Sequence, residues 1–147
     1  MKFFEGKRLI MRQVLGKRLV CTVIEERIII DQSVFISKIS PSYESAYHTN
    51  FLQALFSSKL FSYYFRTSSN EFDELFPKIK IGEFKELPIP VLVRNDQNVF
   101  IQKVENILNI KAADPTADTS ALEAEIDRLV YALYGLTDEE IAIVEGR

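Results

Sequence analysis

The stretch Lys78–Pro90 reads KIKIGEFKELPIP, and it separates two parts of the chain that differ in chemistry. Its apolar and charged residues alternate until Gly82 interrupts them, which predicts a short, half-buried strand with a bend. Pro88 and Pro90 then remove two backbone donors and hold their neighbours in extended geometry, so no helix or central strand can continue through them. We therefore expect the chain to leave a sheet here and enter a different kind of structure.

The charge distribution supports this division. Residues 1–68 hold ten Lys and Arg against five Asp and Glu, residues 69–90 hold three against five, and residues 91–147 hold five against eleven. The net charge of −3 and the isoelectric point near 5.3 are therefore averages over a basic first half and an acidic second half. The average net charge argues against a polyanionic partner. The basic first half taken alone is suited to one.

The totals restrict the class of protein. A chain of 147 residues with 47% hydrophobic residues is long and apolar enough for one packed domain. The single Cys21 cannot form an internal disulfide, and no apolar run approaches the roughly 18 to 20 residues that a membrane span needs. We expect a reducing, cytoplasmic setting without membrane contact, and we expect the chain to be a piece of a longer polypeptide.

The first forty residues alternate as strands do. The expected strands are Arg8–Val14, Arg18–Ile24, Ile28–Ile30 and Ser33–Ile39. A turn at Gly16 and Lys17 joins the first two into a hairpin with a basic tip. We expect the four strands to form a meander.

From Thr49 the period of the apolar residues changes to that of helices. Thr49 or Asn50 can cap a first helix, and Ser57 or Ser58 a second, so a helix tandem is expected at about residues 49–66. The aromatic residues of the second helix can be read as a platform for stacking bases. At helical spacing an aromatic stripe more often belongs to the core, and we interpret it so.

Beyond Pro90 the pattern is helical. The first expected helix begins at Asn95 or Asp96 and ends at the polar segment Lys111–Ser120. The second runs from a capping box at Ser120 and Glu123 to Gly135. The third runs from a capping box at Thr137 and Glu140 to about Val144. The first two should pair as a hairpin. The expected fold class is α+β: residues 1–90 form a β-rich recognition module with embedded helices, and residues 91–147 form a helical hairpin with a short closing helix.

Catalytic motifs are missing from the sequence. It holds no Gly-rich phosphate loop and no CxxC or HExxH motif, and His48 and Cys21 are its only histidine and thiol. One alternative is a metal-dependent nuclease, because Asp73 with Glu83 and Lys85 loosely matches the Asp…Glu-x-Lys pattern that holds a divalent metal. A solvated strand edge explains the same residues, so we assign no catalytic, cofactor-binding or metal-binding residue.

The order of motifs resembles a known family. The motifs are FLQALFSSKLFSYYF at residues 51–65, IKIGEFKELPIP at residues 79–90 and ADTSALEAEIDRLVYALYGLTDEEIAIVEG at residues 117–146. Together they resemble the TaqI-like C-terminal specificity domain, the target-recognition part of adenine-specific DNA methyltransferases in type II restriction-modification systems, including enzymes with a fused endonuclease. The resemblance implies that this chain recognises DNA and has no activity of its own. It also implies that the parent's catalytic domain, with an Asn-Pro-Pro-Tyr or Asp-Pro-Pro-Tyr motif and a site for S-adenosylmethionine, lies upstream.

Duplex DNA and that catalytic domain are therefore the expected partners. Lys and Arg hold phosphates and a few side chains read base edges, and the basic half supplies such residues. The candidate DNA contacts are Lys7, Arg8, Arg12, Lys17, Arg18, Arg27, Lys38 and Arg66. The acidic half should avoid the duplex and pack on the parent enzyme. A second alternative is a protein-interaction module that docks a partner through this acidic hairpin.

Overall fold

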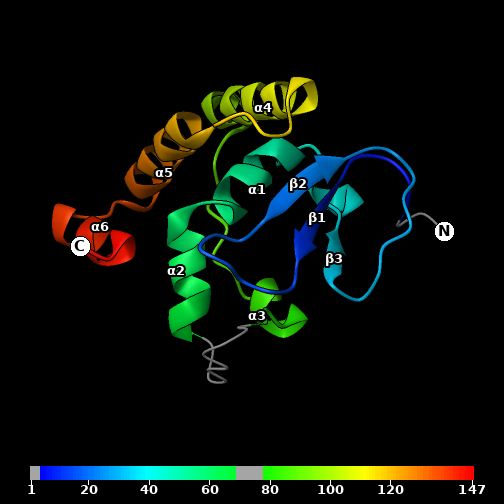
Figure 1. The fold of residues 1–147 in the computed structure, drawn as a ribbon. Helices are drawn as coiled ribbons and strands as arrows, with labels where there is room; N and C mark the ends of the chain where they lie inside the picture. The colour runs from blue at the N-terminus through cyan, green and yellow to red at the C-terminus, as the bar shows by residue number, and fades with distance from the viewer. Residues whose placement is uncertain (1–3, 69–77) are drawn as a thin grey trace.

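The computed structural model describes residues 4–68 and 78–147, and it combines a small antiparallel sheet with helices (Figure 1). The strands are β1 (Arg8–Arg12), β2 (Cys21–Ile24) and β3 (Val34–Ser37). The helices are α1 (Thr49–Phe56), α2 (Lys59–Ser68), α3 (Ile81–Lys85), α4 (Asn98–Ala113), α5 (Ser120–Tyr134) and α6 (Asp138–Glu145), with short 3₁₀ helices η2 (Pro41–Tyr43) and η3 (Arg94–Gln97). The expected α+β class is confirmed.

The sheet is not a meander, because its strand order is β2-β1-β3. Ile10 of β1 pairs with Thr22 on one side and with Ile36 on the other, so β1 is the central strand. The expected strand Ile28–Ile30 is wrong as well: it lies in the connection between β2 and β3, and Ile29 is fully exposed. Both sides of β1 are already paired, so this connection has no place beside the central strand.

The expected bent strand at residues 78–84 is also wrong. Only Lys78 pairs there, in a single antiparallel bridge with Val14, and the chain then turns into α3. The carboxylate of Glu83 accepts the backbone N–H of Lys80 at 3.4 Å, which satisfies a donor at the start of this helix. The alternation of apolar residues was therefore too short to distinguish a strand from one helical turn.

The two prolines do end regular structure, and the irregular segment after α3 is held on both sides by tyrosines. The hydroxyl of Tyr134 on α5 donates to the carbonyl of Pro88 at 2.6 Å, and that of Tyr47 donates to the carbonyl of Pro90 at 3.3 Å. These bonds give a donor to two backbone carbonyls that take no part in β-sheet hydrogen bonding. They also fix the path of the backbone from α3 to η3.

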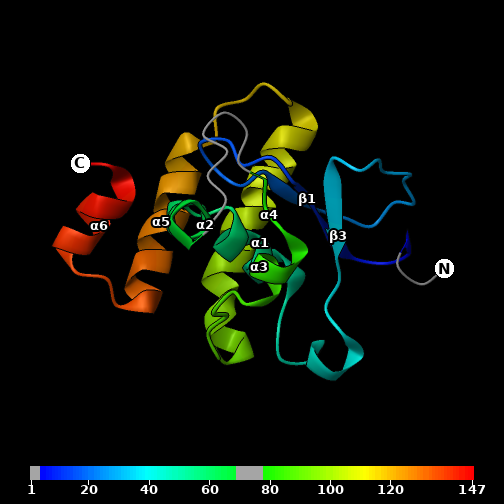
Figure 2. The ribbon, with the colours of Figure 1, turned by 90° about the horizontal axis from the view of Figure 1, so that it is seen from below.

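The layers are the sheet, then α1 with α2, then α4 with α5 (Figures 1 and 2). The core holds Leu9 of β1, Phe51 of α1, Phe100 of α4 and Val130 of α5, each at most 4% exposed. Phe51 and Phe100 meet edge to face, with ring centroids 5.2 Å apart. Side chains from both sides of Pro90 therefore share one core, while the division into functional parts at this residue stays a prediction.

Two helix caps differ by one residue from those expected. The N-cap of α1 is His48, whose Nδ1 accepts the N–H of Asn50 at 3.1 Å, and the N-cap of α5 is Thr119. The capping box at Thr137 and Glu140 before α6 is confirmed, as is the left-handed stop at Gly135 with φ of 67°.

Candidate nucleic-acid interface

Six of the eight cations expected to contact DNA fall into two groups, and three arginines make the first. Arg8 is fully buried, and its guanidinium donates to the carbonyls of Gly6 at 2.7 Å and Glu26 at 2.5 Å. Arg66 on α2 donates to the carbonyl of Gly16. These side chains hold the β1–β2 turn and the end of β2 in place, so the geometry does not favour them as phosphate ligands.

Arg18 is the third member of this group, and it joins the β-rich part to α5. Its Nη1 and Nη2 atoms lie 3.0 and 2.6 Å from the two carboxylate oxygens of Asp127, which is 1% exposed. The same carboxylate accepts the backbone N–H of Lys59, at the first residue of α2, at 2.9 Å. A paired, hydrogen-bonded carboxylate is the form in which a buried charge is tolerated, and here it connects three elements. The expected basic hairpin tip is thus reduced to the exposed Lys17.

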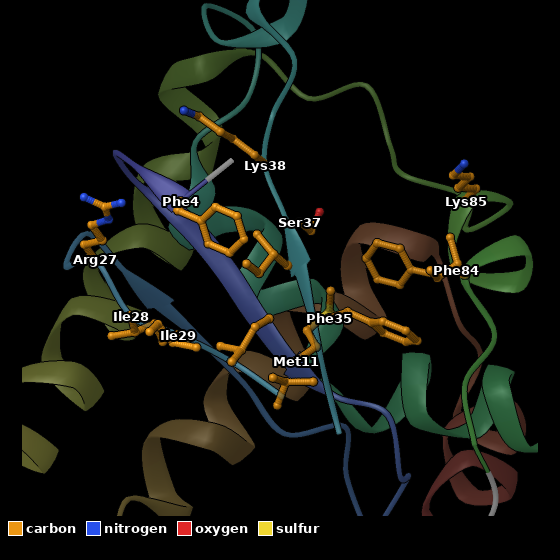
Figure 3. Close-up of a pocket in the computed structure, with 14 residues that line it drawn as sticks. Phe4, Met11, Arg27, Ile28, Ile29, Phe35, Ser37, Lys38, Phe84 and Lys85 are labelled. Atoms are coloured by element: carbon orange, nitrogen blue, oxygen red, sulfur yellow. The ribbon is translucent and has the colours of Figure 1, made fainter. Parts of the chain in front are cut away.

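The second group lies on the side of the sheet near β3. Arg27 and Lys38 line one open groove of about 650 Å³ together with Lys85 of α3, and in Figure 3 the three cations stand around the edge of a hollow. The side chains between them are apolar, including Phe4, Phe35 and the isoleucines of the β2–β3 connection. We call this feature the apolar groove. This lining suits a ligand that carries an apolar group next to an anionic group.

A smaller cavity of about 360 Å³ adjoins this groove, because Lys38 lines both. Lys7, His48 and Arg94 also line this cavity, and Glu44 is the carboxylate residue among its lining. We call it the basic pocket. Sequence reasoning missed Arg94 and Lys85, since both stand in segments of net negative charge; only the fold brings them beside Lys7 and Lys38.

Arg12 stands apart from both cavities. It is exposed at the end of β1 and lines a hollow of about 70 Å³ on the outer face of the sheet, between Val20 and Val34. Whether any of the eight residues contacts DNA stays a prediction. What the structure adds is that Arg27, Lys38 and Lys7 follow one another along two adjacent cavities, with the Nζ of Lys38 also donating to the carbonyl of Glu5 at 3.0 Å. Arg8, Arg18 and Arg66 line neither cavity.

The residues considered for catalysis that the structure describes have other local roles or stand outside the expected elements. Burial raises the pKa of the Cys21 thiol to about 12, and its sulfur faces the carbonyl of Gln53, while His48 caps α1. Glu83 and Lys85 lie on α3 and not on a strand, and Asp73 lies outside the described residues. Within residues 4–68 and 78–147, no group of three or more His, Cys, Asp or Glu residues is placed to hold a metal ion.

Comparison with protein families gives one match. Residues 1–89 match the TaqI-like C-terminal specificity domain. The chain belongs to this family. It is therefore a DNA-specificity domain of the kind found in restriction-modification enzymes, and the family is one of specificity domains and not of catalytic ones.

The match covers the sheet and α1 to α3 and includes Lys7, Arg27, Lys38 and Lys85, but it ends before Arg94. A search of curated proteins found no match for the chain. In the described part of the chain, no helix combines the length and the apolar character that crossing a membrane would demand.

Proposed function

We propose that this domain gives sequence specificity to an adenine-specific DNA methyltransferase of a type II restriction-modification system. It would hold duplex DNA so that a catalytic domain upstream in the same polypeptide, supplied with S-adenosylmethionine, methylates an adenine in the cytoplasm. The observation that carries the proposal is the succession of Arg27, Lys38 and Lys7 along two adjacent cavities in a specificity-domain fold. Cations in such an array hold phosphates and set the register of the protein on the duplex.

The β2–β3 connection is the segment best placed to read bases. It exposes Arg27, Ile29 and Gln32, and the first two of these line the apolar groove. Arg pairs with the acceptor edge of guanine and Gln with the adenine edge, while an aliphatic side chain can contact the thymine methyl group. Asp31 lies between them; hydrogen bonds from the side chain and backbone of Ser33 lower its pKa and keep it an acceptor.

The direct test is binding of this chain to mixed-sequence duplex DNA over a series of salt concentrations. Affinity should fall steeply as salt rises, because phosphate contacts release counterions. Arg27→Gln should weaken binding, whereas Arg128→Gln, an exposed arginine on α5, should not. Equal losses from both variants, or no binding at low salt, would refute the assignment.

The base-reading role needs the parent enzyme. Gln32→Ala should relax the preference for one base pair in the methylated site and leave the rate on other sites less affected, because a lost base contact costs about 1 to 3 kcal/mol of discrimination. Gln102→Ala, an exposed glutamine on α4, is the matched control. Unchanged site preference in Gln32→Ala would remove this residue from the readout.

A further inference from the structure

The basic pocket draws its cations from segments far apart in the chain. Lys7 precedes β1, Lys38 follows β3, and Arg94 begins η3 in the acidic half. Arg94 is exposed, and its Nη1 donates to the backbone carbonyl of Glu44 at 3.1 Å, which holds the guanidinium at the pocket. A single contact of this kind leaves the other guanidinium N–H groups for a ligand.

Among the described residues, the pocket is lined by three cations, Lys7, Lys38 and Arg94, against the one carboxylate of Glu44, and the environment of His48 is consistent with that lining. Burial lowers the pKa of this imidazole, and the charges of Lys7 and Arg94 lower it further, while Glu105 acts in the opposite direction. Lys7 and Arg94 therefore both lie close enough to act on one ring that lines the pocket. Glu44 balances one of the three cations of the lining, so an anion in the pocket would lower the repulsion that remains.

We propose that the basic pocket binds one phosphate group of the DNA backbone, held by Lys7, Lys38 and Arg94. The inference rests on the proposed function, and it deepens it by bringing a residue of the acidic half into contact with the duplex. The planar fork of Arg94 can hold two phosphate oxygens, while the lysines act as point charges on either side. Lys38 also lines the apolar groove, so a phosphate in the pocket would fix the duplex strand beside the segment that reads bases.

The test compares Arg94→Gln with Arg128→Gln in the whole chain, on one mixed-sequence duplex. Loss of a phosphate contact should lower the slope of log affinity against log salt by about 1 and weaken binding to all sequences alike. Arg128→Gln should leave the slope unchanged, and Arg94→Lys should retain most of it. The melting temperature of Arg94→Gln should match that of the unaltered chain, because the side chain is exposed.

A second measurement separates a specific phosphate from a general field. Duplexes with one uncharged methylphosphonate linkage, moved position by position, should show a single linkage that weakens the unaltered chain and has no further effect on Arg94→Gln. If no linkage behaves so, or if Arg94→Gln and Arg128→Gln have equal slopes, the pocket does not bind a backbone phosphate and the proposed function stands. If the unaltered chain binds no duplex at low salt, the proposed function itself fails.

Discussion

Arg18 and Arg27 both belong to the basic, β-rich part of the chain, yet they have opposite roles in the structure. Arg18 faces the helices and forms a double hydrogen bond with the buried Asp127, whereas Arg27 stands at the edge of the apolar groove on the side near β3. The chain thus has a side where cations hold the protein together and a side where they surround cavities. Position in the fold, and not charge count, distinguishes an arginine that bonds to a buried carboxylate from one that lines an open groove.

The largest effect expected from this comparison is on stability at Asp127. Asp127→Ala should lower the free energy of unfolding by about 3 to 5 kcal/mol, because it removes the carboxylate that Arg18 and the N–H of Lys59 share and leaves Arg18 with the carbonyl of Ser57 and the more distant Glu123. Glu139→Ala, an exposed acidic residue on α6, should change it by less than about 0.5 kcal/mol. Urea denaturation measures both. A loss below about 1 kcal/mol for Asp127→Ala would mean that this pair does not join the two parts.

A smaller effect should separate Arg8 from Arg27. Arg8→Lys should lower stability by about 1 to 3 kcal/mol, since one ammonium group cannot replace a fork that reaches the carbonyls of both Gly6 and Glu26. Arg27→Lys keeps a positive charge at an exposed position and should cost less than about 0.5 kcal/mol. Similar melting temperatures for the two variants would contradict the division into structural and surface cations.

The sequence predicts the helices well, because their signals are local. The capping box at Thr137, the left-handed Gly135 and the serine that starts α2 each work through residues within one turn, and the structure has all three: the Oγ of Ser58 accepts the N–H of Phe61 at 3.3 Å. Two stripe residues expected in the core, Phe61 and Phe65, are each 3% exposed. Tyr64 of the same aromatic cluster is 37% exposed, because one face of α2 remains toward solvent.

The strands and the interface are predicted less well, because they depend on distant residues. Ile28–Ile30 has the composition of a strand, but β3 already occupies the free side of β1. Nothing in the sequence near Arg18 shows that its partner is Asp127, 109 residues away. Arg94 lies in the acidic half, which is expected to avoid DNA, and nothing in the sequence near it shows that η3 brings it to the basic pocket.

The smallest effect expected is on the titration of His48, which can be measured cleanly because it is the only histidine. Its pKa should lie below the ordinary 6.5, first because of burial and then because of Lys7 and Arg94. Protonation at Nδ1 would also cost the bond from the N–H of Asn50. The unfolded chain then binds this proton more readily than the folded one, so stability should fall as the pH drops through 6.5 toward the lowered pKa.

NMR titration of the ring protons gives the pKa of His48 directly. It also tests whether the guanidinium of Arg94 lies close to this ring, as the basic pocket requires. Arg94→Gln removes a positive charge acting on the ring and should raise the pKa of His48 toward 6.5, while Arg128→Gln should leave it unchanged. Addition of duplex DNA should also raise it, because a phosphate in the pocket favours the protonated ring. If Arg94→Gln leaves the pKa of His48 unmoved, the guanidinium lies too far from the ring to be part of the pocket. The basic pocket would then lose Arg94, while the comparison of Arg18 with Arg27 would be unaffected, because it does not depend on η3.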